Sequence, residues 1–222
     1  MKTFIVHYAK LAERKRRIIP LLKSNRLDFE FVEHFDRNTI NKKDCKIFKW
    51  ERSFWFMLKP KHKATMAITL SHIYCWIEIA KKYECGLVLE DDAIFNEQFS
   101  GKLELYKKQL PLGWDMLFLG DGCNLHIPDS EIKSGINVYR KDLAPSLWGG
   151  DGGTRCVDSY IVSNPCAQKI AKYIAKLDYK VSQNVDWWLN QIMRDCNLNV
   201  YWAEPTIVTQ GSQKKLYNTS WK

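Results

Sequence analysis

The stretch Gly86-Leu87-Val88-Leu89-Glu90-Asp91-Asp92 places a short apolar run directly before three consecutive carboxylates. Such a run is typical of a short buried strand, and the acids then mark the carboxyl end of that strand. A helix is expected just before it, because apolar residues between Ala64 and Tyr83 recur at intervals of three and four. This order predicts an α/β fold whose ligands bind beyond the carboxyl ends of the strands.

The same alternation of strands and helices extends along the chain. Further strands are expected over residues 3–8, 29–35, 114–119, 157–163 and 199–203, and further helices over residues 11–24, 99–109, 165–176 and 186–196. The alternation predicts a layered α/β fold with a mostly parallel central sheet, in one domain spanning residues 1–222. Residues 38–63 are basic and aromatic without a clear period, and they are expected to form a capping excursion or an acceptor-side surface.

The composition indicates a globular protein with a basic surface. The apolar fraction of 45% and the aromatic fraction of 13% exclude a disordered or collagen-like chain. The formal charge of +9 favours an anionic partner, which is nucleic acid, an anionic membrane surface or a phosphorylated small molecule. The seven cysteines form no CxxC pair and no zinc-ligand spacing, so reduced thiols are expected. Without a recognisable signal peptide or membrane span, the expected location is cytoplasmic, with any membrane contact peripheral at the inner face.

The three acids Glu90, Asp91 and Asp92 are the strongest chemical signal. Adjacent carboxylates repel one another, and a bound divalent cation that prefers oxygen ligands, Mn²⁺ or Mg²⁺, would remove that repulsion. Residues i and i+2 of an extended segment share one face, so Glu90 and Asp92 are expected to point together into a cleft. The alternative is a solvated turn in which one aspartate caps a following helix.

Three further segments contain side chains suited to a ligand site. Ser71-His72 lies on the helix ahead of the acidic strand, and His72 is either a satisfied polar residue or a cleft residue. Residues 148–154, Trp-Gly-Gly-Asp-Gly-Gly-Thr, are interpreted as a mobile substrate loop, because they match neither the P-loop nor the dinucleotide fingerprint. Asp186 is either a helix N-cap or a catalytic carboxylate, and the tryptophans after it are either core residues or a platform for a sugar ring.

In their order along the chain these motifs resemble those of glycosyltransferase family 25, which includes bacterial lipooligosaccharide galactosyltransferases and collagen glycosyltransferases. The segments that carry the resemblance are Phe4–Tyr8 with Arg14 and Arg17, Ser71-His72 with Trp76, Leu89–Ala93, Thr154 with Ser159–Ser163, Val185-Asp186, and Glu204-Pro205 with Gln210-Gly211-Ser212. The sequence departs from the family pattern at His7-Tyr8, where many members have Asn-Leu. It also departs after Glu204, where no histidine metal ligand follows.

The resemblance implies a GT-A-like, Rossmann-type three-layer fold and transfer of a hexose from a nucleotide sugar, with inversion. It implies that Glu90 and Asp92 hold Mn²⁺ or Mg²⁺ and that Asp186 is the catalytic base. The residues expected to bind the donor, UDP-galactose or UDP-glucose, are His7, Tyr8, Arg14, Ser71, His72, Asp91, Gly152, Gly153 and Thr154. The residues expected to contact sugar rings or the acceptor, a glycan or a glycolipid of lipooligosaccharide type, are Trp148, Trp187, Trp188, Gln210 and Ser212.

Two other functions stay open on the sequence. A metal-dependent phosphoryl-group hydrolase would need a second carboxylate cluster, for which Asp121 is the ready candidate. A glycosyltransferase-like binding module without activity would carry the same motifs. Nucleic acid is not expected as a partner, because no recognition motif accompanies the positive charge.

Overall fold

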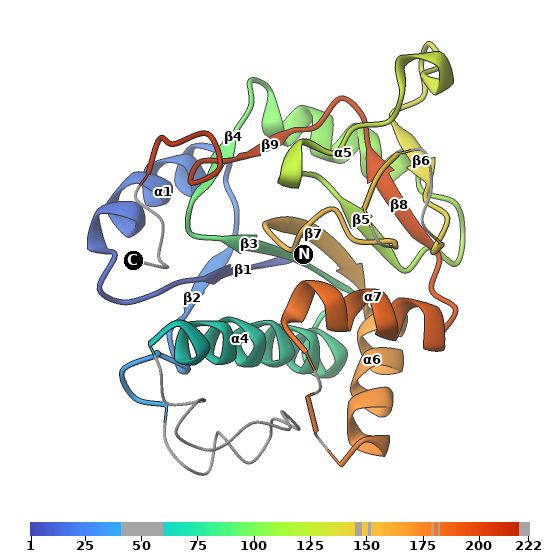
Figure 1. Cartoon of the computed structure of the whole chain (residues 1–222). Helices are drawn as coiled ribbons and strands as arrows, with labels where there is room; N and C mark the ends of the chain where they lie inside the picture. The colour runs from blue at the N-terminus through green and yellow to red at the C-terminus, as the bar shows by residue number, and fades with distance from the viewer. Residues whose placement is uncertain (41–59, 145–147, 151, 179, 182, 218–222) are drawn as a thin grey trace.

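The computed structural model describes residues 1–40, 60–144, 148–150, 152–178, 180–181 and 183–217. Within these residues a seven-stranded sheet runs through the centre of the molecule, and helices cover both of its faces (Figure 1). Its strands are β1 (Lys2–Val6), β2 (Phe29–Val32), β3 (Cys85–Glu90), β5 (Met116–Phe118), β6 (Val138–Arg140), β7 (Ser159–Ser163) and β8 (Val200–Ala203). Their order across the sheet is β2-β1-β3-β7-β5-β8-β6.

Five strands of this sheet run in the same direction. β2, β1 and β3 pair in parallel, and so do β5 and β8. β7 lies between these two groups and is antiparallel to both β3 and β5, and β6 is antiparallel to β8 at the edge. The mostly parallel sheet expected from the sequence is therefore confirmed. The inserted β7 has a consequence for the site, because its first residues lie at the same edge as the last residues of β3.

Helices form a layer on each face of the sheet, as Figure 1 shows. α4 (Pro60–Lys82), α6 (Asn164–Lys176) and α7 (Val185–Asp195) contribute to one hydrophobic cluster, and α1 (Ala12–Ser24) and α5 (Phe99–Gln109) to the other. Along β3, Val88 belongs to the first cluster and its neighbours Leu87 and Leu89 to the second, as the two-residue period of a strand requires. The three-layer α/β arrangement is thus confirmed.

A second, two-stranded sheet brings the end of the chain to the acidic strand end. It pairs β4 (Ala93–Phe95) with β9 (Val208–Gln210) in antiparallel register, with Ala93 opposite Gln210. Neither strand was expected from the sequence, because three residues are too few to show a period.

The structure bears only in part on two sequence expectations, the role of segment 38–63 and the absence of a membrane span. Of the basic and aromatic segment 38–63, residues 41–59 lie outside the described residues. Among the described helices, none has the length and apolar character needed to cross a membrane.

Candidate functional site

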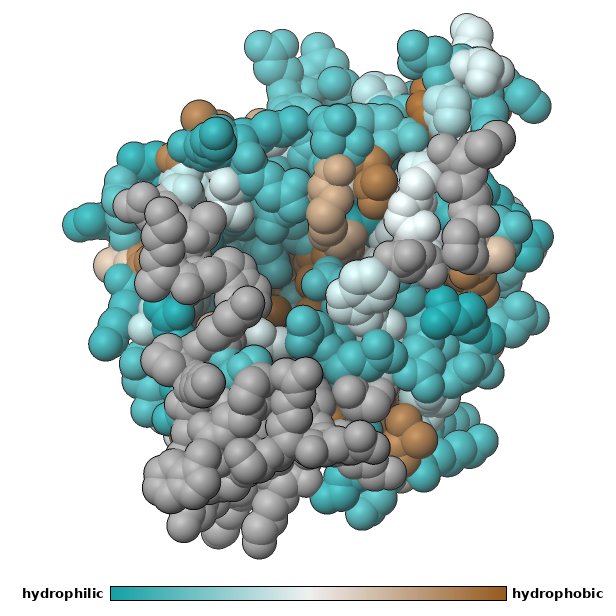
Figure 2. Space-filling view, viewed as in Figure 1, coloured by the Kyte–Doolittle hydropathy of each residue, from teal (hydrophilic) through white to brown (hydrophobic). Residues whose placement is uncertain are grey.

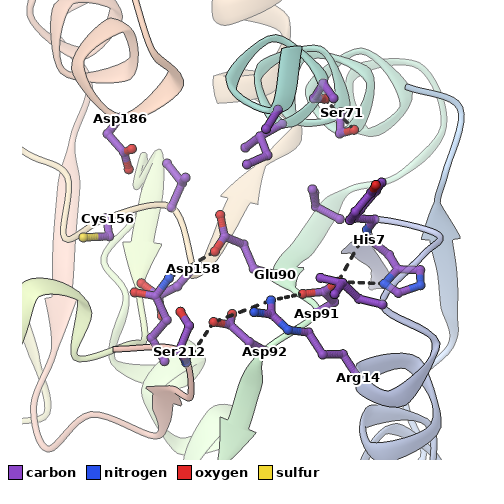
Figure 3. Close-up of a pocket in the computed structure, with 18 of the residues that line it drawn as sticks. His7, Arg14, Ser71, Glu90, Asp91, Asp92, Cys156, Asp158, Asp186 and Ser212 are labelled. Atoms are coloured by element: carbon purple, nitrogen blue, oxygen red, sulfur yellow. Dashed lines mark hydrogen bonds and ion pairs between the residues drawn. The ribbon is translucent and has the colours of Figure 1, made fainter. Parts of the chain in front are cut away.

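A pocket of about 290 Å³ lies at the carboxyl ends of β1 and β3. Outside the residues drawn in grey, the face of the molecule in Figure 2 is mostly hydrophilic. Segments far apart in the sequence line the pocket, from the residues after β1 to those after β9 (Figure 3). Its polar lining consists of His7, Tyr8, Arg14, Arg37, Ser71, Glu90, Asp91, Asp92, Cys123, Cys156, Asp158, Asp186, Gln210, Ser212 and Gln213.

Five carboxylates line the pocket, and four of them, all but Asp91, come from three separate segments of the chain. Glu90 ends β3 and Asp92 follows it, Asp158 directly precedes β7, and Asp186 lies in the first turn of α7 (Figure 3). The amide of Glu90 donates to the carbonyl oxygen of Asp158 at 2.8 Å. This backbone bond extends the β3–β7 pairing by one step and holds Glu90 and Asp158 side by side.

Burial raises the pKa values of three of these carboxyl groups, those of Glu90, Asp158 and Asp186. Burial is the main cause for Glu90, whose pKa lies well above its ordinary value, and the negative charges of the neighbouring aspartates raise it further. Burial also raises the pKa of Asp158 to about 8, although Ser159 Oγ donates to its carboxylate. The pKa of Asp186 is raised by burial as well, against the opposing effect of two backbone amides. The unbalanced negative potential favours a bound cation.

Asp91 points to the other side, toward α1 and the residues after β1 (Figure 3). His7 Nδ1 and Arg14 Nη1 each lie 2.7 Å from one of its carboxylate oxygens, and the amide of Tyr8 donates to it at 3.4 Å. Arg14 Nη1 also lies 3.9 Å from Asp92 Oδ2. Asp91 therefore fixes the segment after β1 against the acidic strand end, and it holds the guanidinium of Arg14 beside the pocket.

The last residue of β9 and the residues after it close another side of the pocket. Gln210 Nε2 donates to Glu90 Oε2 at 3.1 Å, and the amide of Ser212 donates to Asp92 Oδ2 at 3.1 Å. Between them, the amide of Gly211 donates to the carbonyl oxygen of Asp92 at 2.9 Å. A Cβ atom at Gly211 would lie 2.9 Å from that same oxygen, so a side chain there would disturb the contact.

The carboxylates suit a divalent cation, although they do not supply a complete set of metal ligands. Within the described part of the chain, Oδ1 of Asp92 and Oδ1 of Asp158 are buried without a hydrogen-bond partner. Carboxylate oxygens are the ligands that Mn²⁺ and Mg²⁺ prefer. Over the same residues, no group of three or more His, Cys, Asp or Glu side chains is arranged to hold a metal ion. A cation here would therefore need further oxygens from a ligand or from water.

His72 lies in the core and not in the lining of the pocket, which corrects the expectation that it faces the cleft. Its side chain is fully buried, and its Nδ1 lies 2.8 Å from the hydroxyl of Tyr160, which also accepts from Trp76 Nε1 at 2.8 Å. Burial lowers the pKa of His72 to about 3, so the imidazole is neutral. His72 thus connects α4 to β7, whereas its neighbour Ser71 lines the pocket.

The three tryptophans expected to contact sugars lie in different surroundings. Trp188 is fully buried in the core. Trp148 packs against Trp202 with ring centroids 5.6 Å apart, and it does not line the pocket. Trp187 is 51% exposed and is adjacent in sequence to Asp186, which does line the pocket. Of the three, Trp187 is the ring placed to meet a ligand that enters from solvent.

Gly152 and Gly153 pack against α7, and neither they nor Thr154 line the pocket. A Cβ atom at Gly152 would lie 2.7 Å from Asn190 Oδ1, and one at Gly153 would lie 2.7 Å from Met193 Sδ. The amide of Thr154 donates to the same Asn190 oxygen at 2.9 Å. Gly152, Gly153 and Thr154 are absent from the pocket lining, which corrects the expectation that they approach a donor bound there.

The sequence did not indicate five of the polar pocket residues: Arg37 and Gln213, and the three residues Asp158, Cys123 and Cys156. Asp158 is a single acid before an apolar strand, and only the direction of β7 brings it next to Glu90. Cys123 and Cys156 are 33 positions apart in the sequence, yet their Sγ atoms lie 3.0 Å from each other. No local pattern marks any of the three, since each owes its place to pairing between distant segments.

Known proteins resemble this chain over most of its length. The model of the family described as glycosyltransferase family 25 (LPS biosynthesis protein) matches residues 1–186. Procollagen galactosyltransferase 2 of Mus musculus is 23% identical over 154 residues, which are 65% of this chain and 24% of that protein. A procollagen lysyl hydroxylase and glycosyltransferase of Acanthamoeba polyphaga mimivirus is 25% identical over 195 residues, which are 79% of this chain and 20% of that protein.

The chain thus spans about a quarter or less of the length of these curated relatives. Among solved structures, a Drosophila β-1,4-galactosyltransferase 7 mutant in complex with manganese, UDP-Gal and xylobiose is 13% identical. The likeness covers 96% of this chain and 73% of that chain, with a TM-score of 0.45.

Proposed function

Because this chain belongs to glycosyltransferase family 25, we propose that its acidic pocket binds a nucleotide sugar with Mn²⁺ or Mg²⁺ and transfers a hexose to an acceptor hydroxyl. The observation that carries the proposal is the cluster of buried carboxylates at the sheet edge. The raised pKa values of Glu90 and Asp158 and the unpartnered oxygens of Asp92 and Asp158 indicate a site that is electrostatically incomplete without a cation.

Glu90 and Asp92 would hold the cation, with Asp158 beside them, and the donor and water would supply the remaining oxygens, because no three such side chains of the described residues are arranged as a metal site. When bound, the cation would neutralise the charge that develops on the departing diphosphate. Arg14 adds a fixed positive charge at the same side, because its ion pair with Asp91 holds the guanidinium at the pocket. The donor is UDP-galactose or UDP-glucose in this proposal, and the galactosyltransferase among the relatives supports galactose.

The nucleotide would lie on the side of the pocket formed by the segment after β1 and by α4. Tyr8 and Ser71 line that side, and the guanidinium of Arg37 lies 3.9 Å from the centroid of the Tyr8 ring. His7 lies behind them, with its imidazole bonded to Asp91. An aromatic ring backed by a cation offers a flat surface on which a base can stack.

Asp186 is the proposed general base. In an inverting transfer, the acceptor oxygen attacks the anomeric carbon, the bond to the diphosphate breaks, and the base takes the hydroxyl proton. Asp186 lies across the pocket from Asp91 and Arg14 (Figure 3). Because burial raises its pKa, its ionised form takes up a proton more readily than an ordinary aspartate does.

The acceptor is a hydroxyl of a glycan or of a glycolipid of lipooligosaccharide type in this proposal. Trp187 would offer its exposed ring to an acceptor sugar next to Asp186. Contact with an anionic membrane surface would fall to the basic residues of segment 38–63, most of which lie outside the described residues.

The proposal is tested by turnover of UDP-galactose and UDP-glucose in the presence of Mn²⁺, Mg²⁺ or a chelator. Asp186→Asn is expected to lower kcat by about 100-fold or more while nucleotide binding persists, because it removes only the proton acceptor. Asp195→Asn is the matched control: Asp195 lies at the other end of α7, is exposed, and accepts from the hydroxyl of Tyr173. Equal kcat values for the two variants would contradict the role of Asp186.

The same assay separates the two alternatives. Asp121, which a phosphoryl-group hydrolase would need as a second cluster, accepts from the amide of Gln210 at 3.2 Å and pairs with Lys214 at 3.3 Å. It does not line the pocket, so nothing in its placement favours that function. A binding module would bind the nucleotide sugar with the metal and release neither hexose nor UDP.

A further inference from the structure

Two cysteines without a role in the proposed transfer meet at the pocket. Cys123 lies in the short 3-10 turn Gly122–Asn124, and Cys156 lies in the loop ahead of β7. Both line the pocket, and their Sγ atoms lie 3.0 Å apart. Cys123 is exposed and Cys156 is half-buried, so solvent reaches the pair from the side of Cys123.

The backbone permits this approach at Gly122. A Cβ atom there would lie 2.6 Å from the Cβ of Cys156 and 2.6 Å from the carbonyl oxygen of Arg155. Both cysteines have positive φ angles, 54° for Cys123 and 58° for Cys156, which residues other than glycine adopt rarely. The surrounding structure therefore imposes the contact, since local backbone preference does not.

Arg155 supplies much of that constraint. Its side chain is fully buried, and its Nε donates to the carbonyl oxygen of Leu125 at 2.6 Å. Its other nitrogens donate to the carbonyl oxygen of Ala203 and to Glu204 Oε2, each at 2.7 Å. Arg155 directly precedes Cys156, and Leu125 comes two positions after Cys123. One buried guanidinium thus ties together the two loops that carry the thiols.

We propose that Cys123 and Cys156 are a modification site, at which exchange with a small-molecule disulfide such as oxidised glutathione forms an intramolecular disulfide. The thiolate of the exposed Cys123 attacks one sulfur of the small disulfide, forms a mixed disulfide and displaces one small thiol. Sγ of Cys156, 3.0 Å away, then attacks Sγ of Cys123 and gives up its proton, and the second small thiol leaves. The protein thiols lose two protons and two electrons, and the small disulfide takes them up as two thiols.

The new bond would join two parts of the pocket wall. The amide of Cys123 donates to Gln213 Oε1 at 2.8 Å, which connects this loop to the residues after β9. On the other side, Asp158 follows Cys156 by two positions and lines the same pocket. The bond would also close a chain segment between cysteines 33 positions apart, which restricts the unfolded chain and raises the melting temperature.

The test uses the full chain, first reduced and then incubated with oxidised glutathione. After alkylation in denaturant, digestion and mass-spectrometric mapping, the peptide of Cys123 is expected to be joined to the peptide of Cys156. Cys75 and Cys166, which are fully buried, are expected to be alkylated as free thiols. The Tm is expected to rise by several degrees on oxidation and to return to its starting value with dithiothreitol.

Single substitutions test the order of the two steps. Cys156→Ser is expected to keep glutathione on Cys123 as a lasting mixed disulfide, and Cys123→Ser is expected to give no cross-link. Cys196→Ser, a half-buried cysteine outside the pair, is the matched control and is expected to cross-link as the unmodified chain does. A chain that keeps both thiols, or that stops at the adduct on Cys123, would overturn the inference. None of these measurements requires glycosyl transfer, so the inference and the proposed function can fail independently.

Discussion

At its place before β7, Asp158 is fully buried near Glu90 and Asp92, and burial raises its pKa from an ordinary 3.8 to about 8. A carboxyl group whose pKa is higher in the folded than in the unfolded chain stabilises the fold in its protonated form. That contribution is complete below the ordinary pKa and is lost as the pH rises through about 8. The pKa of Glu90 is raised in the same direction, so its contribution has the same sign.

Without metal, the Tm of the protein is therefore expected to fall as the pH rises from about 4 to about 8. Asp158→Asn keeps the shape of the side chain and removes its charge. It is expected to flatten this dependence and to raise the metal-free Tm at pH 8 by several degrees, since the free energy involved is on the order of a few kcal/mol. Thermal unfolding in the presence of a chelator, followed by circular dichroism, measures both effects.

Asp115→Asn is the matched control for that substitution. Asp115 is also buried, but its carboxylate pairs with Lys169 at 2.9 Å and accepts from the amide of Asn199 at 2.8 Å. Its replacement is expected to lower the Tm at pH 8, because a paired carboxylate is stabilising there. If Asp158→Asn also lowered the metal-free Tm at pH 8, the negative charge of Asp158 would not be destabilising the folded protein.

The sequence indicated some residues of the pocket and not others, for physical reasons. Glu90 and Asp92 stand out because the apolar run and the adjacent acids occur together in one short stretch of sequence. Asp158 does not, since its neighbours depend on the direction of β7. The sequence also could not decide whether His72 is buried or faces the pocket, because its partner Tyr160 lies 88 positions away.

At the scale of elements, α4 is fixed to the sheet by a polar contact inside an apolar core. The hydroxyl of Tyr160 on β7 meets both His72 and Trp76 on α4. All three side chains are fully buried, so water cannot replace a lost partner. The contact sets the position of α4 and, through it, that of Ser71 in the pocket.

Tyr160→Phe is expected to lower the free energy of unfolding by roughly 2–4 kcal/mol, because it leaves two buried nitrogens without a partner. Tyr106→Phe is the matched control: Tyr106 lies on the opposite face of the sheet, and its hydroxyl donates one hydrogen bond, to the carbonyl oxygen of Pro205 at 2.9 Å. Tyr106→Phe is expected to lower the free energy of unfolding by less, about 1 kcal/mol. Urea unfolding monitored by tryptophan fluorescence compares the two. If Tyr160→Phe lowered the free energy of unfolding no more than Tyr106→Phe does, the contact of Tyr160 with His72 and Trp76 would not be what fixes α4.

The described α-helices and most strands of the central sheet were predicted from the sequence, whereas three of the shortest strands were not. α6 begins as the sequence indicates, with the hydroxyl of Ser163 accepting from the amide of Cys166 and a proline in the first turn. β4, β6 and β9 have three residues each, and their existence depends on distant partners. This matters for function, because the β4–β9 pair brings Gln210 and Ser212 to the acidic strand end.

At the scale of the whole molecule, the protein is basic while its pocket is acidic. The formal charge is +9, yet among the described residues that line the pocket five carboxylates outnumber the two arginines, Arg14 and Arg37. A diphosphate would therefore be repelled by the pocket alone and attracted once a divalent cation is bound. Recognition of the donor should accordingly depend on metal more than on the net charge of the surface.

The direct test of this central claim is the Tm of the full chain with UDP, with Mn²⁺, and with both. We predict that UDP and Mn²⁺ together raise the Tm by several degrees, in the unmodified chain and in Asp195→Asn, because a ligand that binds only the folded state stabilises it. We predict no comparable rise for UDP with a chelator, or for UDP and Mn²⁺ with Asp92→Asn. If UDP in the presence of a chelator raised the Tm equally, or if UDP and Mn²⁺ raised the Tm of Asp92→Asn undiminished, the pocket would not bind UDP through a metal held by Asp92.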